Sequence, residues 1–172
     1  MQYASLLKKD TVFFSVGVTT NLNSPFHAKP MWSRLNEAGV LLDYKVLNDT
    51  DAIDYGTFFN TLSTQGDSLV KLFGYYADTL NIFPILWTIR YDGQVIRATV
   101  YSDSFSTLIR GDYMSSNKDD NYYLGASYQY SIGAIDAYII KVNSVDSVLW
   151  KKRYGALGRG NSMRRAEYAR RR

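Results

Sequence analysis

Residues 85–101 read ILWTIRYDGQVIRATVY and carry the clearest structural signal in the chain. Apolar and polar residues alternate on both sides of Asp92-Gly93, a dipeptide typical of tight β-hairpin turns. Pairing outward from this turn gives one mainly apolar face, on which the expected pairs are Tyr91 with Gln94, Ile89 with Ile96, Trp87 with Ala98, and Ile85 with Val100. The stretch therefore predicts an antiparallel hairpin with one face on a hydrophobic core.

Alternation of the same kind recurs elsewhere in the chain. It predicts strands near residues 11–19 and 39–47, and a third from Tyr122 to Ile132 that turns near Gly133 and returns over 135–142. With the hairpin, these stretches make about six strands. Their connections are mostly short, so the pairing is expected to be mainly antiparallel.

Between residues 47 and 85 the apolar spacing changes. The apolar residues of the second half recur at helical intervals and are Leu69, Leu72, Phe73, Tyr76 and Leu80. Asp67 or Ser68 is a suitable N-cap, and Pro84 prevents the helix from continuing. A shorter helix is expected from Asp51 to about Leu62, while residues 102–121 are predicted to form a long polar loop. The expected fold is α+β, a mainly antiparallel sheet with a two-helix insert.

Positive charge is concentrated at the C-terminal end. Residues 151–172 hold nine of the chain's 20 Lys and Arg residues, and only one acid, Glu167. The nine are Lys151, Lys152, Arg153, Arg159, Arg164, Arg165, Arg170, Arg171 and Arg172. This segment is near +8 while the whole chain is +4, so residues 1–150 sum to −4. Such a division of charge is typical of an acidic body with a cationic arm that binds something anionic.

Three glycines mark where the body is expected to end. Gly155, Gly158 and Gly160 follow the apolar segment Val145–Trp150. We therefore expect a globular body over 1–152 and a basic C-terminal arm over 153–172, with a short helix capped by Asn161 or Ser162. An isolated helix of this length is marginal in water.

Composition excludes several classes of site. The chain has no cysteine, so disulfides, thiolate zinc sites and iron–sulfur clusters are excluded, and no cofactor is expected. The N-terminal residues lack the pattern of a signal peptide, and no apolar run approaches the roughly 20 residues that a membrane helix needs. The expected location is a virion or the cytoplasm, without membrane contact.

No complete catalytic motif is present. His27 is the only histidine and is expected in a surface loop. Asn117-Lys118-Asp119-Asp120 matches the N-K-x-D pattern of GTPases, but the phosphate-binding loop that must accompany it is absent. Gly155, Gly158 and Gly160 show the reverse of the dinucleotide-binding spacing and are interpreted as a flexible joint. We assign no catalytic residue and no metal ligand, and expect a protein that is not an enzyme.

One constellation leaves an enzyme open as the third hypothesis. Asp43-Tyr44-Lys45, with Glu37 shortly before it, resembles the acid-x-Lys strand of metal-dependent nucleases. In those enzymes carboxylates hold Mg²⁺ and the lysine orients the attacking water. Asp43 and Lys45 fit equally well on the solvent face of the strand predicted over 39–47.

Binding is the function that the sequence favours. Arginine suits phosphate and carboxylate partners, and the nine basic residues are the candidate site. In general composition the chain resembles viral coat and connector proteins, which often join a tyrosine-rich, β-rich body to a cationic terminus. We therefore expect a structural subunit of a large multi-chain assembly, most plausibly a capsid, connector or tail component of a phage or virus. Its partners would be other protein subunits, with packaged nucleic acid as a further candidate, and the alternative is a free-standing nonspecific nucleic-acid-binding protein.

Overall fold

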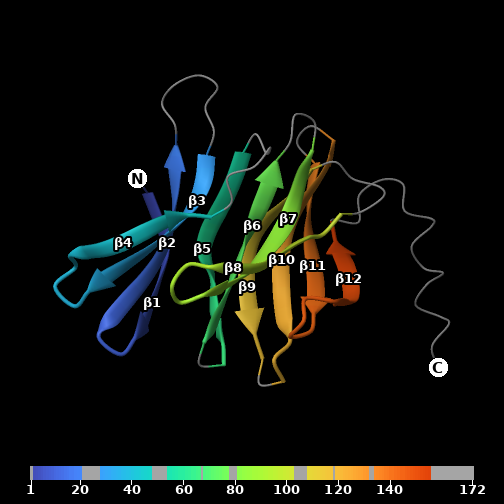
Figure 1. The fold of residues 1–172 in the computed structure, drawn as a ribbon. Coiled ribbons are helices and arrows are strands. Elements are labelled where there is room, and N and C mark those ends of the chain that lie inside the picture. The colour runs from blue at the N-terminus through green and yellow to red at the C-terminus, as the bar shows by residue number, and fades with distance from the viewer. Residues whose placement is uncertain are drawn as a thin grey trace, which may run out of the picture.

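The computed structural model describes residues 2–20, 28–47, 54–66, 68–77, 81–102, 108–117, 119–131 and 134–155. In these residues the only regular structure is β-strand (Figure 1). The strands are β1 (Gln2–Lys9), β2 (Val12–Thr20), β3 (Ala28–Asn36), β4 (Leu41–Val46), β5 (Asp54–Gln65), β6 (Leu69–Ala77), β7 (Ile82–Arg90), β8 (Val95–Val100), β9 (Leu108–Ser116), β10 (Tyr122–Ser131), β11 (Ala134–Val142) and β12 (Val148–Tyr154). The described part of the chain is all-β.

The predicted two-helix insert, and with it the α+β class, is wrong. β5 and β6 occupy the residues in which the helices were expected. In β6 the residues from Val70 to Phe73 are all buried, because both faces of this strand lie in the core. A strand buried on both faces shows a continuous apolar run instead of alternation, and such a run contains helical spacings by chance.

The strands form three four-stranded antiparallel units of similar topology. Unit 1 is β1–β4, unit 2 is β5–β8 and unit 3 is β9–β12, and in each unit the strands pair in sequence order. Units 2 and 3 are joined by one parallel residue pair, Ile82 with Leu108, so together they count as an eight-stranded sheet. Figure 1 shows the units side by side, from blue at the N-terminal end to red at the C-terminal end.

Two hydrophobic cores hold the units face to face. The first lies between units 1 and 2 and includes Phe14, Trp32, Leu72 and Trp87. The second lies between units 2 and 3 and contains mainly Phe73 and Leu86 of unit 2 with residues from β9, β10 and β11. Unit 2 therefore contributes to both cores and is the middle layer of the stack.

The arrangement is that of consecutive blades of a β-propeller. The first strands of the units, β1, β5 and β9, contact one another in sequence order, and the last strands, β4, β8 and β12, are mostly exposed. Each unit thus runs from an inner first strand to an outer last strand. Among the described residues the arc has two end faces, one on unit 1 and one on unit 3, each turned away from unit 2.

The turn before the last strand of each unit has the same geometry. The N–H of its first residue donates to the backbone oxygen four positions later, and the oxygen of that first residue accepts from the N–H three positions later. The fourth residue of the turn has a positive φ. The turns are Asn36–Gly39, Arg90–Gly93 and Asn143–Asp146. Their spacing of 54 and 53 residues reveals a repeat that the sequence analysis did not find.

This turn explains why two of the four predicted hairpin pairs are wrong, since Arg90 and not Tyr91 pairs with Gln94. Trp87 pairs with Ala98 and Ile85 with Val100, as expected. Ile89, however, pairs with Val95 and not Ile96, because the loop contains Gly93 as an extra residue in the left-handed region. Three-residue hairpin loops of this kind end in a bulge, which shifts the register by one residue beside the turn.

Some of the other strand predictions are confirmed, and some strands were not predicted. The strands expected near 11–19, 39–47, 122–132 and 135–142 are confirmed as β2, β4, β10 and β11. β1, β3, β9 and β12 were missed, and β5 and β6 were predicted as helices, so the described residues hold twelve strands and not about six. β9 lies inside the predicted 102–121 loop, and β12 extends to Tyr154, two residues past the expected end of the body.

Two glycines test the packing of unit 3. A Cβ on Gly111 of β9 would lie 2.2 Å from the backbone oxygen of Gly74 in unit 2, whereas a Cβ on Gly125 of β10 would meet its nearest neighbour at an ordinary 3.6 Å. We expect Gly111→Ala to lower the free energy of unfolding by about 1–3 kcal/mol, because β9 must move away from unit 2. Gly125→Ala is the matched control and should change it by less than about 1 kcal/mol. Urea unfolding followed by circular dichroism measures both, and equal losses would contradict the close approach.

Candidate functional site

Three of the nine predicted basic site residues lie on β12, the outermost strand of unit 3. Lys151, Lys152 and Arg153 follow one another there and alternate between the two faces of the sheet. The remaining six are Arg159, Arg164, Arg165, Arg170, Arg171 and Arg172, and they lie outside the described residues. The structure therefore places one end of the basic segment on the edge of the sheet stack.

Arg153 is committed to a contact within its own unit. Its Nε donates to Asp136 Oδ2 at 2.5 Å, and its guanidinium lies 4.2 Å from the centre of the Tyr128 ring. Asp136 is buried, and a Cβ on Gly155 would collide with its carboxylate. The described fold thus extends to Gly155, and Arg153 fixes β12 to β11 instead of presenting a free charge.

A row of cationic and aromatic side chains covers the end face of unit 3. Lys141 Nζ lies 5.3 Å from the centre of the Tyr123 ring, whose edge meets Trp150 at 6.1 Å between ring centres. Lys152 Nζ lies 4.9 Å from the Trp150 ring. These four side chains, which we call the unit 3 end face, combine flat apolar surfaces with positive charge.

The end face of unit 1 has a different chemistry. A hollow of about 210 Å³ opens there, and its lining is largely apolar. The side chains of Leu6, Phe13 and Leu35 form its floor and walls, and Glu37 and Gly39 of the β3–β4 turn form its rim. Leu6 is 63% exposed. Lys8 pairs with Glu37 across the rim at 3.2 Å.

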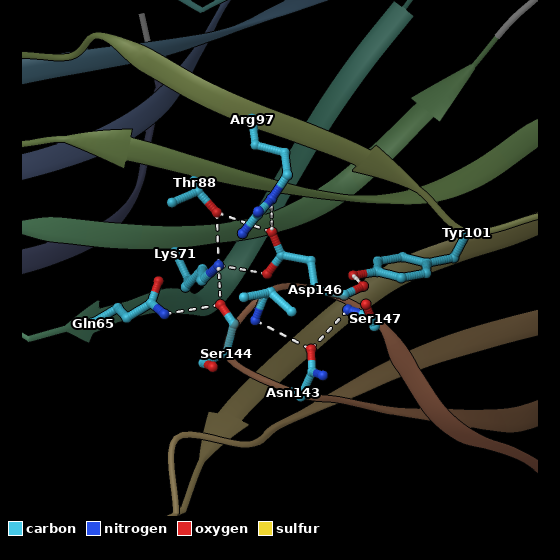
Figure 2. A network of polar contacts seen from close by, with 10 residues as sticks. Gln65, Lys71, Thr88, Arg97, Tyr101, Asn143, Ser144, Asp146 and Ser147 are labelled. Carbon is cyan, nitrogen blue, oxygen red and sulfur yellow. Dashed lines mark hydrogen bonds and ion pairs between the residues drawn. The ribbon is translucent and has the colours of Figure 1, made fainter.

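A buried ionic network joins units 2 and 3, and Figure 2 shows its side chains converging on Asp146. The carboxylate of Asp146, in the β11–β12 turn, accepts from Lys71 of β6, from Thr88 of β7 at 3.1 Å and from Arg97 of β8 at 2.6 Å. The hydroxyl of Tyr101 donates to the Asp146 backbone oxygen at 3.1 Å. One turn of unit 3 is thereby held by three strands of unit 2.

Burial changes the ionisation of this network. Desolvation lowers the pKa of Lys71, an effect that its hydrogen bond to Asp146 opposes. Desolvation also raises the pKa of Tyr101 well above its usual value, and that of nearby Tyr122 to about 12. A buried lysine with a lowered pKa is a candidate catalytic group, but here its ammonium also donates to Thr88 and to the Ser144 backbone oxygen. With these contacts filled, the geometry is that of a structural ion pair.

The residues of the nuclease hypothesis do not form a metal site. Asp43 is held by both nitrogens of an Arg34 fork, and this hydrogen bonding lowers the pKa of the carboxyl and raises that of the guanidinium. Glu37 pairs instead with Lys8, and Lys45 lies against Gly93 of unit 2. Within the described ranges, no group of three or more potential ligands is placed to hold a metal ion.

The remaining predicted motifs have structural roles or lie elsewhere. Asn117 begins the β9–β10 turn, where its side-chain oxygen accepts from the backbone N–H of Asp119 and of Asn121 at 3.1 and 3.0 Å. The GTPase-like pattern is therefore a hairpin turn. His27, Gly158 and Gly160 lie outside the described residues.

Sequence reasoning missed both end faces and the Asp146 network. The missing signal was the turn pattern, in which Asn36 and Asn143 each begin a turn and Gly39 and Asp146 occupy its left-handed position. Aspartate tolerates this backbone conformation better than most residues, so Asn-x-x-Asp and Asn-x-x-Gly are equivalent signals.

Comparison with known proteins supports the fold alone. No protein-family model and no curated protein matches the sequence. A solved structure of a DUF4221 family member from Bacteroides vulgatus is similar, with a TM-score of 0.50 and 10% sequence identity over 87% of this chain. The match spans 51% of that protein, so this chain corresponds to about half its length. The described residues include no helix long and apolar enough to cross a membrane.

Two aspartates in ion pairs of different burial provide a test of the network. Asp146→Asn keeps the shape and the left-handed backbone but leaves Lys71 and Arg97 without a negative partner. Because Lys71 is fully buried, we expect a loss of about 3–5 kcal/mol in the free energy of unfolding. Asp43→Asn breaks the half-exposed pair with Arg34 and should cost less than about 1 kcal/mol. Chemical denaturation of both variants provides the measurement. If Asp146→Asn lowers the free energy of unfolding no more than Asp43→Asn does, the Asp146 network does not hold units 2 and 3 together.

Proposed function

We propose that this chain is a non-enzymatic structural subunit of a multi-chain assembly, anchored to an anionic neighbour by its basic C-terminal segment. The observation that carries the proposal is the charge distribution, since residues 151–172 are near +8 and the preceding body is −4. The segment leaves the body from β12, at the edge of the stack. An anchor at an edge can reach a neighbour without disturbing either core.

The chemistry of the anchor follows from its arginines. Six of the nine basic residues come after Gly155, and all six are arginine. The planar guanidinium donates two parallel hydrogen bonds to a carboxylate or a phosphate, which gives both attraction and orientation. An acidic groove of a protein subunit and packaged nucleic acid both present such acceptors. The proposed class of assembly remains a virion component, such as a capsid, connector or tail subunit, on the basis of composition.

The three basic residues on β12 have a lesser role in this anchor. Arg153 neutralises buried Asp136, and Lys151 Nζ donates to the Ser102 backbone oxygen at 2.7 Å. Arg153 and Lys151 thus hold the strand from which the segment departs, while Lys152 lies over Trp150 on the unit 3 end face. The partner should therefore be gripped mainly by residues after Gly155.

Truncation after Gly155 tests the anchor. The shortened chain keeps Arg153 and its contact with Asp136, so it should fold with unchanged stability. The full chain should bind a short single-stranded DNA and a polyglutamate peptide, measured by fluorescence anisotropy, and the shortened chain should lose this binding. If six arginines meet phosphates, the logarithm of DNA affinity should fall with the logarithm of salt at a slope of about −4 to −5. Equal affinity of the two chains for both probes would refute the anchor.

The unit 3 end face favours a second candidate, a free-standing nonspecific nucleic-acid-binding protein. Proteins that bind single strands combine aromatic rings, on which bases stack, with cations that follow the backbone. Tyr123 and Trp150 supply the rings, and Lys141 and Lys152 the cations.

Trp150→Ala distinguishes the two candidates. Loss of a stacking platform costs about 1–3 kcal/mol per base, so this candidate predicts an affinity for single-stranded DNA that is at least several-fold weaker. The subunit proposal predicts unchanged DNA affinity, because its anchor lies after Gly155. Anisotropy titrations of Trp150→Ala against the parent chain decide between them, with Tyr44→Ala on unit 1 as an exposed aromatic control.

A further inference from the structure

The two end faces of the arc occupy positions that are buried wherever one unit meets the next. Each unit contains two hairpins, and the three units can be aligned on the residue pair that closes each hairpin. For the first hairpin these pairs are Lys9–Val12, Gln65–Leu69 and Asn117–Asn121. For the second hairpin they are Asn36–Val40, Arg90–Gln94 and Asn143–Ser147. This alignment gives the strand residues beside both turns of unit 1 counterparts in units 2 and 3.

On the face that looks back toward the preceding unit, the counterparts are core residues. In unit 2 they include Leu62, Val70 and Ile89, which pack in the first core. In unit 3 they are Met114, Tyr122 and Val142, which pack in the second core. The same positions in unit 1 are Leu6, Phe13 and Leu35, which form the hollow of the unit 1 end face.

On the face that looks forward toward the next unit, the correspondence also holds. Phe14 and Trp32 of unit 1 pack in the first core. Their counterparts in unit 2 are Lys71, which is buried against Asp146 of unit 3, and Leu86 of the second core. Tyr123 and Ile139 of unit 3 align with Phe14 and Trp32, and both are only half-buried. The arc therefore ends in one face shaped to receive a following unit and one shaped to receive a preceding unit.

The second turn of each unit makes the closing contact at both internal interfaces. Tyr91, the second residue of its turn, places its ring 4.7 Å from that of Phe14, and its backbone oxygen accepts from Trp32. Ser144 is its counterpart in unit 3, and its backbone oxygen accepts from Lys71. The counterpart in unit 1 is Glu37, whose side chain is 58% exposed and pairs with Lys8 of the same end face.

The same geometry defines what Glu37 would meet on a preceding unit. Phe14 aligns with Tyr123, and Arg34 aligns with Lys141. The negative charge of Asp92, in the turn of the following unit, raises the pKa of the Arg34 guanidinium. Lys141 stands beside Tyr123 on the unit 3 end face. Thr88, the counterpart of Lys141 in unit 2, meets Asp146, which aligns with Gly39. A unit 1 placed after unit 3 would thus bring the Lys141 ammonium to residues 38–39, next to the Glu37 carboxylate and its partner Lys8, and the Tyr123 ring to the hollow lined by Leu6, Phe13 and Leu35.

We infer that a second copy of this chain docks its unit 1 end face on the unit 3 end face of the first, and that two such contacts related by a two-fold axis close a ring of six sheets. Six blades lie within the usual range of four to eight for closed propellers. The two-fold axis makes both contacts identical, and it pairs the end faces that the described residues form. This inference rests on the proposed function and identifies one subunit partner as the chain itself.

Charge reversal at the predicted contact is the test. In the parent chain, light scattering coupled to size exclusion should give twice the chain mass of 19.6 kDa. Glu37→Lys and Lys141→Glu each place like charges together and should raise the dimer dissociation constant at least about tenfold. The double variant Glu37→Lys with Lys141→Glu restores opposite charges and should restore the dimer. Asp119→Lys, an exposed charge reversal in the β9–β10 turn, should have no effect.

Each further result decides for or against the closed ring. A parent chain that stays monomeric at high concentration, or a dimer that neither single reversal weakens, overturns it. Failure of the double variant to recover the dimer also overturns it, provided that circular dichroism and thermal melting show that variant to be folded. The chain truncated after Gly155 should still dimerise, since the contact lies within the body. Loss of polyanion binding with retention of the dimer therefore separates the anchor from the ring.

Discussion

Burial of the middle sheet on both faces is the constraint on which the rest of the structure depends. Val70 and Trp87 face unit 1, while Phe73 and Leu86 face unit 3, so neither core can form without unit 2. Many antiparallel sheets have one buried and one solvated face, whereas the sheet of unit 2 carries apolar side chains on both faces and needs a neighbour on each. The outer units consequently each have one face packed on unit 2 and one face left at an end of the arc.

Stacked sheets need a device that fixes how far one slides across the next, and here it is a turn. The β7–β8 turn reaches back to unit 1 through Tyr91, and Gly93 fits there because a Cβ would lie 2.6 Å from the Trp32 ring. The β11–β12 turn reaches back to unit 2 through Asp146, which binds three strands at once. The first contact is aromatic and the second is ionic. The β7–β8 turn is therefore complementary to unit 1, and the β11–β12 turn to unit 2. Breaking the buried ionic contact would cost several kcal/mol, which makes slippage unfavourable.

What could be predicted from the sequence depended on how many faces of a strand are buried. β2, β4, β10 and β11 each alternate in exposure or apolarity and were found, as was the hairpin of β7 and β8. β5 and β6 were both predicted as helices. For β6 the reason is that it has two buried faces, a property of the tertiary stack that a local pattern does not encode. The repeat was hidden because its strongest marker, the left-handed turn position, is glycine twice and Asp146 once. The basic residues were visible as charge, but the pairing of Arg153 with buried Asp136 required the fold.

The same turn position also explains why charge, and not only apolar area, should govern the ends of the arc. Apolar faces attract one another without direction, so Leu6, Phe13 and Leu35 alone would accept many sheets. Tyr91 at one interface and the Asp146 network at the next show that this fold adds a directional contact at the tip of each second hairpin. In the proposed ring, Glu37, which pairs with Lys8 at that tip of unit 1, would lie beside Lys141 of unit 3, so charge as well as apolar area would contribute to the choice of end face.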